Sequence, residues 1–143
     1  MKDYRDKIAL WLICLLAVAC TTEEQGFIDD DGIGDVYRKK SQELCEQSWI
    51  NTYQDDTGKH YTEKLEFDIG RNGKESIIIK FTDGVILTAI GYFVWHWSDE
   101  QQNTLQIEYS STDIIYFTDV RTQNGVLQLY SEEDESNITY LAE

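Results

Sequence analysis

The chain has 143 residues, three cysteines, no proline and a formal net charge of −15. A surface this acidic repels phosphate backbones and anionic headgroups, so the composition argues against nucleic-acid binding and against electrostatic docking on anionic lipid. Acidity at this level is more typical of a well-solvated surface than of an acidic binding site.

The first twenty residues have the pattern of an export signal. A basic opening precedes an apolar run over residues 8–19, which stops at Cys20. That run is shorter than the roughly 20 apolar residues of a membrane-spanning helix. Residues 1–19 are therefore interpreted as a signal peptide, and their removal leaves a net charge of −16.

Small residues, Ala17, Val18 and Ala19, precede Cys20. They resemble the lipobox of bacterial lipoproteins, which implies that Cys20 is diacylated, becomes the N-terminus and anchors the protein in a membrane. The lipobox usually has a large aliphatic residue three positions before the cysteine, whereas Leu16 lies four before it. The same residues also form an A-x-A site, and cleavage there would release an unacylated protein.

Residues 20–43 are predicted to be an acidic tether, because residues 26–35 (GFIDDDGIGD) show no sustained periodicity. The pair Glu23 and Glu24 resembles the signal that sends some Bacteroidetes lipoproteins to the outer face of the outer membrane. A merely solvated tether explains the same pair equally well. Residues 36–47 have the spacing of a short helix with a thin apolar face.

From Trp49 onward the apolar period becomes two, which predicts strands. Leu65, Phe67 and Ile69 alternate with charged residues in the clearest case. Eight strands are predicted, at residues 49–53, 64–69, 76–82, 85–98, 104–110, 113–122, 126–131 and 137–142.

The connections between these strands are short and rich in turn residues, as in residues 55–58, 71–73 and 123–125. None can hold a crossover helix, so the strands must be antiparallel. The prediction is an all-β domain over residues 44–143, an eight-stranded antiparallel up-and-down barrel. Charged outward residues such as Lys64 and Glu108 favour a barrel in water.

Residues 44–140 resemble the small lipocalin-like lipoproteins of Bacteroidetes. The resemblance is carried by Trp49, Leu65-x-Phe67, Phe93-x-Trp95-x-Trp97, Leu105-x-Ile107-x-Tyr109 and Tyr140. Lipocalins proper have Gly-x-Trp where this chain has Gln47-Ser48-Trp49. The resemblance implies an eight-stranded barrel and, by analogy, the binding of a small apolar molecule.

Phe93, Trp95 and Trp97 lie on one face of the longest predicted strand and are the candidates for lining a ligand cavity. The alternative is that they fill the core, because an eight-stranded barrel is just wide enough for its own side chains or for one small ligand.

No catalytic constellation is evident. Cys45, His60 and His96 have no spacing that indicates a nucleophile with its base or a metal site. We therefore expect a non-enzymatic cell-envelope lipoprotein without cofactor or metal, in which the barrel binds a small apolar ligand. The alternative is a barrel with a filled core that binds another envelope protein.

Overall fold

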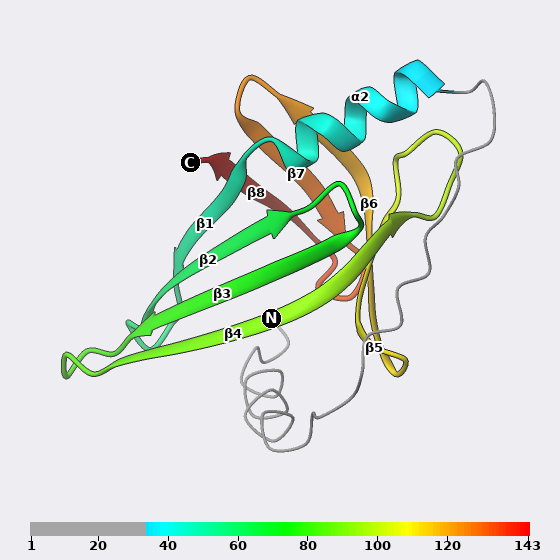
Figure 1. Cartoon of the computed structure of the whole chain (residues 1–143). Helices are drawn as coiled ribbons and strands as arrows, with labels where there is room; N and C mark the ends of the chain where they lie inside the picture. The colour runs from blue at the N-terminus through cyan, green and yellow to red at the C-terminus, as the bar shows by residue number, and fades with distance from the viewer. Residues whose placement is uncertain (1–33) are drawn as a thin grey trace. The chain divides into compact units, whose positions relative to one another are not determined.

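One helix and eight strands form the part of the chain that the computed structural model describes, residues 34–143, with side chains from residue 39 onward. The elements are α2 Gly34–Cys45, β1 Ser48–Gln54, β2 His60–Phe67, β3 Asn72–Lys80, β4 Ile86–Trp97, β5 Leu105–Ser110, β6 Asp113–Gln123, β7 Val126–Ser131 and β8 Ser136–Ala142 (Figure 1). The predicted signal peptide, Cys20 and the first part of the predicted tether lie outside these residues.

The strands close into a barrel with the order β1 to β8. Each strand pairs antiparallel with the next, and β8 pairs with β1. The predicted eight-stranded up-and-down barrel is therefore confirmed. It follows from the short connections, which allow hairpins and exclude parallel crossovers.

The barrel is closed mainly at the end next to α2. There β4 pairs with β5 only through residues 94–97, and β1 pairs with β8 only at Trp49 and Ile50. Away from this end β1 to β4 continue as a sheet, and the β3–β4 hairpin reaches farthest from the rest of the barrel (Figure 1). These two short pairings are the β4–β5 seam and the β1–β8 seam. Beyond them, at the open end of the barrel, the strands form two groups, β1–β4 and β5–β8.

Alternate residues along each strand point into the barrel, as the period of two requires. In β2 the buried positions are Tyr61, Glu63, Leu65 and Phe67. The main core consists of Leu44, Trp49, Leu65, Phe67, Phe93, Trp95, Leu105, Ile107, Phe117, Val120, Leu127, Leu129 and Tyr140. Each large apolar side chain buried in this way contributes about 1.5–3 kcal/mol.

The second turn differs from the sequence prediction. Residues 71–73 were expected to form it, and Ile69 was expected to point inward, but the turn spans residues 68–71 and Ile69 is 61% exposed. Asp68 organises it, because its Oδ1 accepts the Gly70 amide at 2.7 Å and its carbonyl accepts the Arg71 amide at 2.9 Å. Arg71 takes the positive φ of 70°, so Asn72 is free to begin β3.

Gly73 is a strand residue, opposite Phe67 on β2 and Phe93 on β4. A Cβ at this position would lie 1.9 Å from the Phe93 ring. The two phenylalanine rings meet edge to face, with centroids 5.5 Å apart. Gly73 is therefore needed to make room for the Phe93 ring, and not to form a turn.

Helix α2 covers the closed end of the barrel. Leu44 is fully buried, and its carbonyl accepts the Trp49 indole N–H at 2.8 Å. The Lys40 ammonium donates to the Gln102 carbonyl at 2.8 Å, and the Thr122 hydroxyl donates to Glu43 at 2.7 Å. The helix thus includes the last ten residues of the predicted tether, 34–43. No helix among the described residues is long and apolar enough to cross a membrane.

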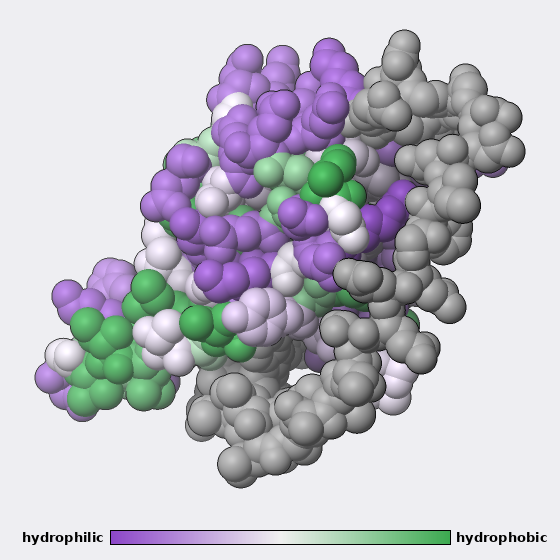
Figure 2. Space-filling model, viewed as in Figure 1, coloured by the Kyte–Doolittle hydropathy of each residue, from purple (hydrophilic) through white to green (hydrophobic). Residues whose placement is uncertain are grey.

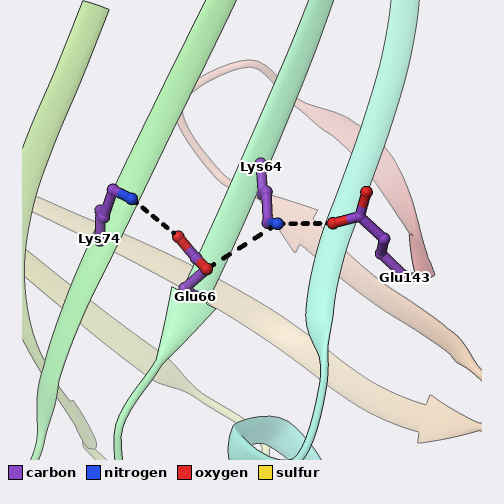
Figure 3. Close-up of polar contacts among 4 residues, drawn as sticks. All are labelled: Lys64, Glu66, Lys74 and Glu143. Atoms are coloured by element: carbon purple, nitrogen blue, oxygen red, sulfur yellow. Dashed lines mark hydrogen bonds and ion pairs between the residues drawn. The ribbon is translucent and has the colours of Figure 1, made fainter.

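A chain of ion pairs spans the outside of the short β1–β8 seam (Figure 3). Glu143, whose amide donates to the Ser48 carbonyl at 2.9 Å, pairs with Lys64 of β2. Glu66 lies 3.9 Å from Lys64 and 3.2 Å from Lys74 of β3. Exposed pairs of this kind add little to the stability of the barrel.

Candidate functional site

Phe93, Trp95 and Trp97, here called the aromatic ladder, face the barrel interior, where they pack against other side chains. Phe93 is 4% exposed and Trp95 is 2% exposed, while Trp97 is half-buried. The Trp95 ring meets the Phe67 and Trp97 rings edge to face, with centroids 5.7 and 6.2 Å away. Edge-to-face packing is the favoured geometry of a filled aromatic core.

The indole N–H groups of the ladder are engaged within the fold. Trp95 donates to the carbonyls of Asp68 at 3.1 Å and Asn72 at 3.2 Å. Trp97 donates to the Ser41 hydroxyl of α2 at 2.9 Å. These polar groups, which could have oriented a ligand, instead hold the 68–71 turn and the helix on the barrel.

Two hollows of the described residues lie on the outer wall. One, of about 350 Å³, is formed over β6, β7 and β8 by Asp119, Arg121, Gln128, Leu129, Asn137 and Thr139. The other, of about 370 Å³, is formed over β2, β3 and β4 by Glu66, Phe67, Asp68, Asn72, Gly73, Lys74 and Tyr92. Neither is lined by Phe93, Trp95 or Trp97.

Two buried carboxyl groups lie on the inner face of β2 and β3. Glu63 and Glu75 are each 6% exposed. Tyr140 donates to Glu63 at 2.8 Å, and Tyr109 donates to Glu75 at 2.9 Å. Neither glutamate was a candidate from the sequence, because Glu63 and Glu75 precede the predicted strands 64–69 and 76–82. The parity of Glu63 with Leu65 is the signal that could have found it, once β2 is known to begin at His60.

The Tyr140 hydroxyl contributes to stability through its bond to Glu63. Tyr140→Phe is expected to lower the free energy of unfolding by about 1–3 kcal/mol, because it withdraws a hydrogen bond from a buried polar group. Urea denaturation followed by tryptophan fluorescence measures this loss. Tyr116→Phe, at a side chain that is 43% exposed, is the control and should change little. Equal stabilities of the two variants would contradict the assigned role.

The outer face of β4 is apolar over most of its length. Tyr92 is 72% exposed, and Ile86, Ile90 and Val94 are between 43% and 59% exposed. On the neighbouring β3, Ile78 is 42% exposed. Figure 2 shows apolar surface gathered over the end of the β3–β4 hairpin. This face was not anticipated from the charged outward residues of the other strands.

The remaining candidates from the sequence lie far apart. His60 begins β2 at the open end of the barrel, and His96 lies near the end of β4 beside α2. Cys45 is a half-buried free thiol at the end of α2. Among residues 34–143 no group of three or more His, Cys, Asp or Glu side chains is placed to hold a metal ion.

The Cys45 thiol should be unreactive in the folded protein. Burial, together with the negative charge of Asp68, raises its pKa from 9.0 to about 11. At pH 8 the thiolate population, and with it the rate of alkylation by iodoacetamide, is expected to fall roughly 10- to 100-fold below that of the unfolded chain. Mass spectrometry of the alkylated Cys45 peptide measures the rate from pH 7 to 11. A folded rate equal to the unfolded one would contradict this expectation.

Comparison with known proteins identifies no relative: the chain matches no family model, no curated protein and no solved structure.

Proposed function

We propose that this chain is a cell-envelope lipoprotein, attached to the outer membrane through acylated Cys20, whose barrel is a non-enzymatic module that binds through its outer wall. One observation carries the proposal: the core around Trp95 is filled, while much of the exposed apolar surface lies outside, on β4. Exposed apolar patches on soluble folds mark interaction sites.

A small apolar ligand beside Phe93, Trp95 and Trp97 is the competing function. Such a ligand would have to displace Phe93 and Trp95, which are almost fully buried, and break the indole bonds to the 68–71 turn and to Ser41. Farther along the interior it would meet the buried carboxyl groups of Glu63 and Glu75. These features favour the outer wall as the binding surface.

Native mass spectrometry distinguishes the two functions. The protein, purified from its membrane in a mild detergent, is expected to have the mass of the acylated chain or of its protein complexes. A stoichiometric small-molecule adduct that is lost on unfolding would contradict the proposal and restore the ligand-binding alternative.

Attachment at Cys20 is tested by metabolic labelling with a palmitate analogue. The wild-type chain and Cys14→Ala should be labelled and fractionate with the outer membrane, whereas Cys20→Ala should lose the label. Labelling that persists in Cys20→Ala would refute attachment at this residue. Loss of labelling in Cys14→Ala alone would move the site to Cys14.

A further inference from the structure

Two-thirds of β4, residues 86–93, is an open sheet edge. Residues 86–94 pair with β3, but only residues 94–97 pair with β5. Within residues 34–143, therefore, no strand lies along the other side of residues 86–93. Backbone N–H and C=O groups on such an edge are a template for a further strand. Figure 1 shows the β3–β4 hairpin diverging from β5 along this stretch.

This edge lacks the features that usually protect one. Residues 84–98 contain no Asp, Glu, Lys or Arg, and the chain contains no proline. Natural edges are commonly protected by charges, prolines or bulges. The pairing of β3 with β4 has no register shift, so no bulge twists the edge away. Its side chains at Ile86, Leu87 and Ile90 are 43–59% exposed.

The sequence of the edge favours a second copy as the occupant, because residues 84–98 carry no charge and can pair with themselves. Two copies with a net charge of −15 each repel one another over most of their surface. Beside the open edge, however, the outward charged residues of β3 are the lysines Lys74 and Lys80, which pair with Tyr92 and Ile86 of β4. Two copies can therefore meet at β4 without bringing carboxylates together.

We infer that two copies of this chain associate through antiparallel pairing of their β4 edges, which joins the two β1–β4 sheets into one. This deepens the proposed function, on which it rests, because it names the partner of the outer wall. The contact is isologous: a two-fold axis relates the two strands, as in most homodimers.

A two-fold axis at Thr88 gives a self-complementary register. Thr88 then lies opposite Thr88 of the second copy, and Ile86 lies opposite Ile90, on the outer face. On the inner face Leu87 lies opposite Ala89. Thr–Thr and branched aliphatic pairs are favourable across strands, and no like charges lie opposite each other.

Disulfide trapping tests both the pairing and the register. Thr88→Cys is introduced into the acylated protein, with the free thiol Cys45 changed to serine, and the protein is oxidised in a mild detergent. Directly opposed strand residues have Cα atoms about 4.5–5.5 Å apart, which a disulfide spans. Thr52→Cys is the matched control, on the polar edge of β1 beyond Ile50. A covalent dimer is expected from Thr88→Cys only.

Sedimentation equilibrium of the full chain with its natural cysteines reduced provides the second readout. Ile90→Lys is expected to weaken the dimer at least about 10-fold, because it places a charge in the paired edge. Ile114→Lys, at a side chain 38% exposed on β6, is the control and should dimerise like the wild type. Circular dichroism confirms that both variants are folded.

Three results would overturn the inference. They are a monomeric wild type, a dimer that survives Ile90→Lys, and equal trapping at Thr52 and Thr88. Survival of the dimer would indicate a contact elsewhere. A monomeric Cys20→Ala protein that binds phosphatidylcholine vesicles and loses this binding on Ile90→Lys would assign the edge to lipid. None of these outcomes produces the small-molecule adduct that would contradict the proposed function, so the two are tested separately.

Discussion

Replacement of Trp95 by alanine is expected to destabilise the barrel by about 3–5 kcal/mol, the range for a large aromatic side chain removed from a packed core. Trp95 is 2% exposed, and its ring contacts the Phe67 and Trp97 rings edge to face. Its indole N–H also donates to the carbonyls of Asp68, in the 68–71 turn, and of Asn72, directly after it. The variant therefore loses apolar contacts and a link between β4 and this turn.

Denaturant unfolding followed by far-ultraviolet circular dichroism measures the loss. Tyr92→Ala is the matched control, because Tyr92 lies on the same strand with its ring 72% exposed. It should change the free energy of unfolding by roughly 0.5 kcal/mol or less, as surface substitutions usually do. Similar losses in the two variants would show that Trp95 is not a core residue.

Gly73→Ala is expected to destabilise the barrel by about 1–3 kcal/mol through overpacking. The added Cβ would fall 1.9 Å from the Phe93 ring, and that ring cannot swing away freely because it is 4% exposed and also meets the Tyr109 ring. Either Phe93 leaves its position or β3 and β4 separate locally.

The same unfolding measurement applies, and Gly70→Ala is the control. A Cβ at Gly70 would lie 2.8 Å from Oδ1 of Asp68, so this variant loses the exposed hydrogen bond between that oxygen and the Gly70 amide but displaces no buried ring. Near-ultraviolet circular dichroism should also change in Gly73→Ala, because the rings around Phe93 are displaced. A Gly73→Ala protein as stable as Gly70→Ala would show that the ring does not require glycine there.

The barrel was predictable because its strands are short, alternate in polarity and are joined by turns that permit only hairpins. The error at residues 71–73 arose because Asn72-Gly73 is a strong turn signal, and the sequence does not show that the Phe93 ring requires the glycine. Nor does the Asp68 side chain, which organises the actual turn, stand out before the register is known.

The candidate site was predictable only in part. Phe93, Trp95 and Trp97 face inward as expected from their parity, but whether they line a cavity or fill a core depends on α2 and the 68–71 turn closing over them. The open β4 edge could not be predicted. The alternation of apolar and polar residues locates the strands, but it does not show that β4 pairs with β5 over residues 94–97 only.

The filled interior is tested most sharply by the binding of a benzene-sized probe, followed by nuclear magnetic resonance, to the wild type and to Trp95→Ala. Cavities of roughly 150 Å³ in apolar cores bind benzene, so the variant, if folded, supplies the positive control. The wild type is expected to bind no probe in the barrel, whereas Trp95→Ala should bind one. Saturable binding to the wild type that shifts the Trp95 and Trp97 indole signals would contradict a filled core.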